Sequence, residues 1–318
     1  MTNPLDMINK SKNIAIISHV NPDGDSLGSI LGLGLALKKI HTNVTIYVND
    51  IVPGKYEFLP GLHLLKKYDN EALDEYDLTF VLDCGDINRL GYSTTLLSRS
   101  KKVFNIDHHI SNNSFGDYNI VDAHASSTCE LVYDFLSKEL NITVDNEIAT
   151  CLYVGINTDT GSFKYDNTSP STHIVTAHLL EAGINIEYIT YNLYQNNSIS
   201  NMKFLGHVLS HLALYLDDKV AIVDITDDLI EKYSIDAAET DSIINYARDI
   251  KGIEVAITLR ELEEDLIKIS LRAKGDFDVN KLANIFGGGG HKKASGAVIR
   301  GSIDNVRESI LNEIKKSL

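Results

Sequence analysis

The chain has 318 residues, of which 43% are hydrophobic, and its formal net charge is -15. This length suits two domains of ordinary size, and this apolar fraction is normal for a chain that buries a core. A strongly acidic chain lacks the basic face that neutralises the phosphates of long nucleic acid, so we expect no long duplex partner. A small phosphorylated ligand held by metal ions remains compatible with this charge.

The compartment signals favour the cytoplasm. No run of 18 apolar residues occurs, so we expect no membrane span and no membrane partner. Residues 1–10 lack the apolar centre of a secretory signal. The three cysteines, Cys84, Cys129 and Cys151, are odd in number and have no paired spacing, which is typical of a reducing compartment.

The first predicted element is a buried strand that leads into a polar segment. Residues 13–17 are an apolar run, and residues 18–29 follow it with His19, Asp23 and Asp25. In open α/β sheets, ligands bind beyond the carboxyl ends of the strands, so we place these three side chains at such an edge. One imidazole and two carboxylates together suit a hard to borderline divalent ion.

A helix is predicted after this segment. It is clear over residues 30–40 and could begin as early as Leu27, with Ser26 as its N-cap. Gly24 allows a tight turn between the two aspartates. The alternative interpretation is a polar loop in which Asp23 and Asp25 only cap the helix.

Further strands alternate with helices along the first half of the chain. Strands are expected at 43–48, 77–82 and 103–106, and helices at 127–140 and from 146 to about 157. This alternation predicts an α/β fold with a mainly parallel sheet and helices on both faces.

Three of the four predicted strands end in acidic or imidazole residues, which predicts one shared site. The residues concerned beyond the first segment are Asp83, Asp86, Asp107, His108 and His109, and Asp159 joins them just after the helix predicted from 146 to about 157. We interpret Asp86 as structural. A mixture of histidine and aspartate favours Mn²⁺, and two ions roughly 3.5–4 Å apart can activate water and hold phosphoryl oxygens.

The second half of the chain predicts a smaller α/β domain. Helices are expected at 171–182, 198–214, 227–233, 237–250, 279–286 and 303–316, and strands at 219–223, 254–259 and 266–272. A segment rich in Tyr and Asn, residues 187–198, is a candidate linker. We expect a catalytic metal-binding domain over 1–190, a linker helix over 191–215 and a substrate-binding domain over 216–318, with the active site in the cleft between the domains.

These motifs together resemble the DHH phosphoesterase superfamily. The first segment, Asp83, the Asp107-His108-His109 triplet and Asp159 are similar to its four motifs, in the same order. The glycine-rich run 287–297 is similar to the signature of the DHH-associated C-terminal domain. Within the superfamily, the length and plan look most like the NrnA-like oligoribonucleases and pAp phosphatases, and like the stand-alone cyclic dinucleotide phosphodiesterases.

The resemblance implies a role for each matched residue. One Mn²⁺ ion would be held by His19, Asp23 and Asp83, and a second by Asp25, Asp83, His108 and Asp159, with Asp83 shared. His109 would act on the scissile phosphate as donor or general acid, and Asp107 would orient the histidines. Mg²⁺ or Co²⁺ could substitute for Mn²⁺.

The resemblance also implies substrate-binding residues. Phosphate would be gripped by the backbone amides of Gly288, Gly289 and Gly290, by His291 and by Arg272. Arg89 either contacts phosphate or pairs with Asp86, and the sequence leaves both open.

The implied activity is Mn²⁺-dependent hydrolysis of short oligonucleotides, such as pApA to AMP, and of adenosine 3′,5′-bisphosphate to AMP and phosphate. The alternative is a cyclic di-AMP phosphodiesterase. An inorganic pyrophosphatase of family II and a nucleotide sensor without catalysis are less favoured. The protein could act as a homodimer.

Overall fold

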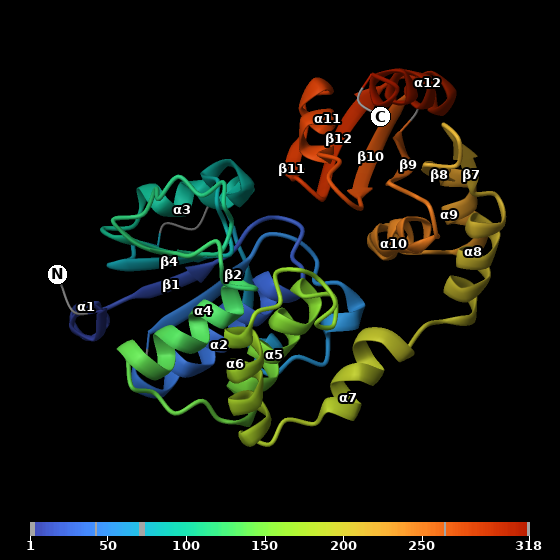
Figure 1. Cartoon of the computed structure of the whole chain (residues 1–318). Helices are drawn as coiled ribbons and strands as arrows, with labels where there is room; N and C mark the ends of the chain where they lie inside the picture. Colours follow the sequence, from blue (N-terminus) through green and yellow to red (C-terminus); the bar gives the residue numbers. More distant parts are fainter. Residues whose placement is uncertain (1–3, 42, 70–73, 264, 317–318) are drawn as a thin grey trace. The chain divides into compact units, whose positions relative to one another are not determined.

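The computed structural model describes residues 4–41, 43–69, 74–263 and 265–316 (Figure 1). The chain divides into two compact units, with the division between Asn196 and Asn197. Each unit has its own six-stranded sheet and its own hydrophobic core, so the α/β fold class is confirmed.

The sheet of the first unit is entirely parallel, in the order β3-β2-β1-β4-β5-β6. The strands are β1 (Ile14–Ile17), β2 (Val44–Val48), β3 (Leu65–Lys67), β4 (Leu78–Leu82), β5 (Val103–Asp107) and β6 (Tyr118–Val121). The four strands predicted from apolar runs are present. The edge strands β3 and β6 were missed, because both are short and largely unburied, so neither shows an apolar run.

Helices cover both faces of this sheet, as expected (Figure 1). Successive residues of β1 point to opposite faces, so Ile14 and Ile16 join the main core while Ala15 and Ile17 join a second core. The helices are α1 (Pro4–Lys10), α2 (Gly24–Ile40), η1 (Gly54–Tyr56), η2 (Leu62–Leu64), η3 (Ile87–Ser93), α3 (Thr94–Ser98), α4 (Thr128–Asp134), η4 (Phe135–Glu139), α5 (Asn146–Asp159), α6 (Pro170–Glu181), α7 (Ile186–Thr190) and η5 (Tyr191–Gln195).

Helix α2 begins earlier than predicted. Its N-cap is Asp23 and not Ser26, because the Asp23 carboxylate accepts from the Ser26 amide at 3.0 Å while the Ser26 hydroxyl accepts from the Asp23 amide at 2.8 Å. This reciprocal capping box starts the helix at Gly24. Asp25 therefore lies in the first helical turn and not in a loop.

Helices α2 and α5 approach each other closely through glycines. A Cβ atom on Gly28 would lie 2.4 Å from the carbonyl oxygen of Cys151, and one on Gly155 would lie 2.8 Å from Oδ1 of Asp25 in α2 and 2.2 Å from Sγ of Cys129 in α4. Only a residue without a side chain fits at either position. This contact fixes the start of α2 against the end of α5.

The second unit contains a mixed sheet in the order β11-β12-β10-β9-β8-β7, in which β8 and β9 are parallel and the other pairs antiparallel. Its strands are β7 (Ala213–Tyr215), β8 (Val220–Ile225), β9 (Val255–Glu263), β10 (Leu266–Ala273), β11 (Gly289–His291) and β12 (Ala294–Arg300). Its helices are α8 (Ile199–Ser210), α9 (Asp227–Tyr233), η6 (Ala237–Ser242), α10 (Ile243–Asp249), α11 (Val279–Ile285) and α12 (Ile303–Ile314).

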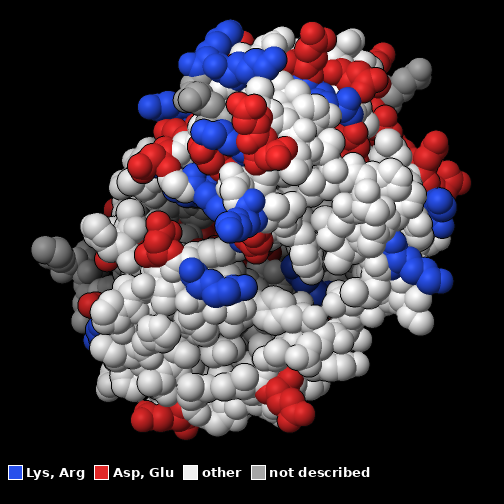
Figure 2. All heavy atoms as spheres, turned by 45° about the vertical axis from the view of Figure 1, so that its right-hand side comes forward, with Lys and Arg blue, Asp and Glu red and all other residues white. Residues whose placement is uncertain are grey.

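Two local predictions in this unit were wrong. The helix expected over 198–214 ends at Ser210, and β7 follows it. In the glycine-rich run, for which the sequence had been interpreted as a loop, Gly289–His291 pairs with β12 as an antiparallel strand. No helix in the described part of the chain is long and apolar enough to cross a membrane. On the face that Figure 2 shows, Lys and Arg lie interspersed with Asp and Glu.

Substituting Gly28 tests the close contact between α2 and α5. We expect Gly28→Ala to lower the free energy of unfolding by about 1–3 kcal/mol, because the new methyl group overpacks against the backbone of α5. Guanidinium unfolding followed by circular dichroism measures this change. The matched control is Gly54→Ala, where no atom lies within 4 Å of the added Cβ, and we expect no measurable loss there. Equal stability of both variants would contradict the contact.

Candidate metal centre

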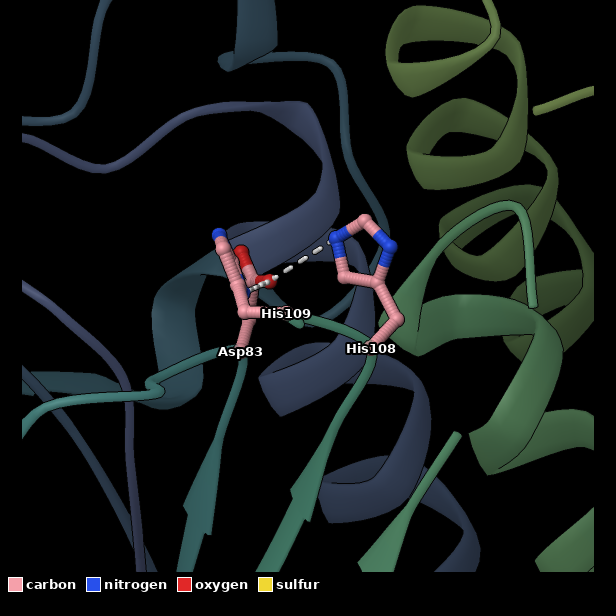
Figure 3. Close-up of side chains that lie close together, drawn as sticks. All are labelled: Asp83, His108 and His109. Carbon is pink, nitrogen blue, oxygen red and sulfur yellow. Dashed lines mark ion pairs between the residues drawn. The ribbon is translucent and has the colours of Figure 1, made fainter. Parts of the chain in front are cut away.

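Three neighbouring strands deliver polar side chains to one edge of the first sheet. His19 follows β1, Asp83 follows β4, and Asp107 is the last residue of β5, with His108 and His109 directly after it. Because β1, β4 and β5 are adjacent and parallel, their carboxyl ends meet. Figure 3 shows the imidazole rings of His108 and His109 beside the Asp83 carboxylate. Asp83 has a left-handed backbone conformation with φ of 55°, which Asp adopts more readily than most residues.

Two helices complete the group. Asp25 comes from the first turn of α2, and Asp159 is the last residue of α5. The Asp25 carboxylate accepts hydrogen bonds from the backbone amides of Thr128 at 2.7 Å and Cys129 at 2.9 Å. These bonds hold Asp25 against the start of α4.

His19 is oriented so that one ring nitrogen faces the carboxylates. Its Nδ1 lies 2.7 Å from the carbonyl oxygen of Val20, and because a carbonyl only accepts, Nδ1 carries the proton. In the neutral ring, Nε2 therefore has a lone pair. Nε2 lies 3.2 Å from Oδ2 of Asp83 and 3.9 Å from Oδ2 of Asp23. His19, Asp23 and Asp83 can thus offer one nitrogen and two oxygens to one cation.

His108 has a similar position among three other carboxylates. Its Nε2 lies 3.6 Å from Asp159, 3.7 Å from Asp83 and 3.8 Å from Asp25. Three groups of residues have possible ligand atoms within 4.8 Å of one another: His19/Asp23/Asp83, Asp25/His108/Asp159 and Asp83/His108/His109. The first group has the same members as one ligand set implied by the sequence resemblance, and the second contains three of the four members of the other set, without Asp83. Asp83 lies close to His19 on one side and to His108 on the other.

His109 is held by a different carboxylate. Its Nδ1 lies 2.6 Å from Oδ1 of Asp107, and the second Asp107 oxygen accepts from Nδ2 of Asn112, also at 2.6 Å. Asp107 is fully buried, which opposes ionisation, but these hydrogen bonds outweigh burial and leave the pKa of Asp107 below its usual value. An ionised Asp107 therefore fixes the orientation of the His109 ring.

The electrostatics of the centre favour a cation. Burial, followed by the nearby charge of Asp25, raises the pKa of Asp83 well above its usual range. Burial and the charge of Asp25 likewise raise the pKa of Asp159 to about 8. Buried carboxylates that repel one another are stabilised by a positive ion, and a mixed nitrogen and oxygen donor set suits a borderline divalent metal. The residues present fit such an ion.

The site also contains contacts that were not predicted from the sequence. The Thr128 hydroxyl donates a hydrogen bond to Oδ1 of Asp83 at 3.1 Å. The sequence did not predict this bond, because helix capping already explains a polar residue at the start of a helix. Asn112 bonds both Asp107 and Asn105, and its position after the triplet carries no motif signal. Thr128 and Asn112 reach Asp83 and Asp107 only in the folded chain.

Arg89 lies in η3 with an exposed side chain, and its backbone carbonyl accepts from the Val20 amide at 2.8 Å. This bond ties the Arg89 segment to the loop that carries His19. Asp86 accepts from the Asn88 amide at 2.9 Å and caps η3, which fits its structural interpretation.

The remaining predicted residues belong to the second unit. Arg272 lies on β10 and its Nη1 donates to the Leu271 carbonyl at 3.0 Å. Gly288 precedes β11, where an added Cβ would lie 2.1 Å from the Gly296 carbonyl oxygen, and a Cβ on Gly290 would lie 2.5 Å from the Ala294 carbonyl oxygen. Both glycines are thus required for strand pairing. Gly289 begins β11, and the side chain of His291 lies outside the described part of the chain.

Comparison with known proteins adds independent findings. Residues 13–156 match the model of the DHH family, N-terminal domain, and residues 206–318 match the DHHA1 domain. The chain is 32% identical over 308 residues to the bifunctional oligoribonuclease and PAP phosphatase NrnA of Thermus thermophilus, covering 96% of this chain and 90% of that protein.

Two solved structures are similar in fold. The crystal structure of an exopolyphosphatase-related protein from Bacteroides fragilis matches with a TM-score of 0.91 and 30% identity, covering 98% of this chain and 95% of that chain. The structure of RecJ in complex with Mn²⁺ from Thermus thermophilus matches with a TM-score of 0.57 and 12% identity, covering 98% of this chain and 53% of that chain. The latter shows likeness of fold alone.

Substituting Asp83 tests the metal centre without an activity assay. We expect Mn²⁺ at roughly 100 times its Kd to stabilise the folded protein by about 2.7 kcal/mol, measured as a rise in Tm. Asp83→Asn keeps the volume and tolerates the left-handed backbone, so we expect it to lose this rise while its metal-free Tm does not fall. Asp86→Asn is the control and should respond as the unchanged protein does. A normal Mn²⁺ response in Asp83→Asn would refute the centre.

Metal binding should also release protons. Burial opposes the charge of His108, but Asp159 and the other carboxylates outweigh it and raise its pKa to about 9, while that of Asp159 is about 8. Because Asp159 raises the pKa of His108 only while it is ionised, the two groups titrate as a coupled pair, which together retains at least one proton at pH 7 and must release it to bind a cation. We expect Mn²⁺ affinity to rise from pH 6 to pH 9, measured by calorimetry in two buffers with different ionisation enthalpies. Affinity independent of pH would contradict this expectation.

Proposed function

This chain belongs to the DHH family and is an enzyme of the phosphoesterase class, and we propose that it hydrolyses short oligonucleotides and adenosine 3′,5′-bisphosphate. The observation that carries the proposal is a pair of neighbouring groups of possible metal-binding residues, one of which contains Asp83 while His108 of the other lies 3.7 Å from Asp83. The substrate class is supported by the name of the NrnA relative, which spans nearly the same length.

We propose two Mn²⁺ ions, one held by His19, Asp23 and Asp83 and the other by Asp25, Asp83, His108 and Asp159. When bound, such ions activate water and stabilise the charge that develops on a phosphoryl group. The mixed donor set and the repulsion among the buried carboxylates support this assignment. Mg²⁺ or Co²⁺ could bind at the same residues, although this donor set suits them less well than Mn²⁺.

His109 is proposed to act as the general acid. Its Nδ1 is engaged by Asp107, so Nε2 is the atom that can give a proton to the leaving oxygen. Asp107 is proposed as a positioning residue that also stabilises the protonated ring, because it is buried, ionised and held by Asn112. The general acid and the ligand groups then act on the same phosphate.

In the second unit, Arg272, the backbone amides of Gly288, Gly289 and Gly290, and His291 are proposed to bind a second phosphate of the substrate. Arginine contacts phosphate oxygens in a bidentate manner, and clustered amides form an anion site. Arg89 is proposed as a further phosphate contact, since its segment is joined to the His19 loop. Two phosphate sites in one enzyme would favour substrates a few nucleotides long.

The cell compartment and the class of partner are part of this proposal. All three cysteines are buried and free, which supports a reducing cytoplasm. The net charge of -15 disfavours long duplex nucleic acid, so short nucleotides are the proposed partners. A homodimer stays a prediction.

Side-by-side rates with Mn²⁺ test the function. We expect release of AMP from pApA and of phosphate from adenosine 3′,5′-bisphosphate, with cyclic di-AMP and pyrophosphate slower by at least about tenfold. Loss of a metal ligand in Asp83→Asn should lower these rates by at least about 100-fold, whereas Asp86→Asn should keep them. Fastest turnover of cyclic di-AMP would establish the alternative phosphodiesterase, and no turnover of any substrate would indicate a sensor.

A further inference from the structure

The segment that follows Asp159 is an unusual and firmly held turn. Gly161, Ser162 and Phe163 have φ values of 57°, 61° and 62°, so three successive residues adopt the left-handed conformation. Non-glycine residues adopt it at a free-energy cost, and such strain persists only where surrounding contacts enforce it. Here the Nδ2 group of Asn167 donates to the Asp159 carbonyl at 3.2 Å. The turn is therefore tied directly to a residue of the metal centre.

Tyr165 is held by this turn but remains partly open to solvent. Its amide donates to the Thr160 carbonyl at 3.0 Å, and its ring packs on Gly161, where an added Cβ would lie 2.4 Å from a ring carbon. The residue is nevertheless 37% exposed. An aromatic ring is thus presented in a fixed orientation beside the turn that follows Asp159.

Tyr194 is anchored to the same helix from the segment rich in Tyr and Asn. Its hydroxyl donates to Oδ1 of Asn157 at 2.6 Å, and Asn157 lies on α5 just before Asp159. Tyr194 is 44% exposed while Asn157 is 6% exposed. Two partly exposed tyrosines therefore bond or pack against the two ends of one short stretch, residues 157–161, with Asp159 in its middle.

We propose that Tyr165 and Tyr194 form the surface on which the base of the nucleotide stacks when its phosphate lies at the metal centre. This proposal rests on the proposed function. The metal ligands can recognise only the phosphate, and every nucleobase has a flat face that an aromatic ring accepts. Stacking of this kind is worth about 5- to 150-fold in affinity for each base and discriminates little among bases. It would let the enzyme accept short nucleotides of any sequence while rejecting phosphate esters without a base.

Paired substrates and matched variants test the proposal. The substrates are pApA and two analogues, each of which lacks one of the two adenines. We expect Tyr165→Ala and Tyr194→Ala to raise KM for pApA by about tenfold or more with little change in kcat, because the lost contact is to the base. Tyr165→Phe keeps the ring and should keep KM. On the analogue that lacks the stacked adenine, the unchanged protein should already have the raised KM, and the alanine variants should add nothing.

The control is Tyr191→Ala. Tyr191 lies on η5 with Tyr194 and is 49% exposed, but its hydroxyl contacts Asn196 and not α5. We expect its KM for pApA to be unchanged. Unchanged KM in Tyr165→Ala and Tyr194→Ala, or an equal loss on pApA and on both analogues, would overturn the stacking proposal. If the unchanged protein hydrolyses neither pApA nor adenosine 3′,5′-bisphosphate, the proposed function itself is wrong and the stacking proposal falls with it.

Discussion

The mutual repulsion of carboxylates around Asp83 is the constraint on which the first unit depends. Asp83 is 2% exposed, has a left-handed backbone and lies between His19 and His108, and the charges of Asp25 and Asp23 act on it. A protein does not gather buried negative charge without compensation. The compensation within the chain is partial, through the Thr128 hydroxyl and the imidazoles, so a divalent cation is the natural completion of the structure.

The same charge explains how an acidic protein can process an anionic substrate. An acidic protein and a phosphate-bearing substrate repel each other, and a net charge of -15 makes nonspecific adhesion of nucleic acid unfavourable. Cations bound at the cluster of carboxylates would reverse the sign of the potential locally. Attraction would thereby be confined to one small region, which would suit substrates with few phosphates better than a polymer.

Much of the fold could be predicted from the sequence, but the assembly of the site only in part. Apolar runs placed β1, β4 and β5, and the rule that ligands bind at strand ends brought Asp83 and Asp107 together. The start of α2 was predicted wrongly because Ser26 is a good N-cap in isolation, and the choice of Asp23 depends on a reciprocal bond. The contact of Thr128 with Asp83 depends on tertiary packing and leaves no local pattern.

Gly155 has a consequence for the evolution and engineering of this fold. A glycine inside a helix destabilises it by about 1 kcal/mol relative to alanine, so Gly155→Ala would ordinarily be a stabilising change. A methyl group at this position would instead lie 2.8 Å from Oδ1 of Asp25. The helix therefore gives up intrinsic stability to leave room for the Asp25 carboxylate, and thermostabilising substitutions should avoid the interior of α5.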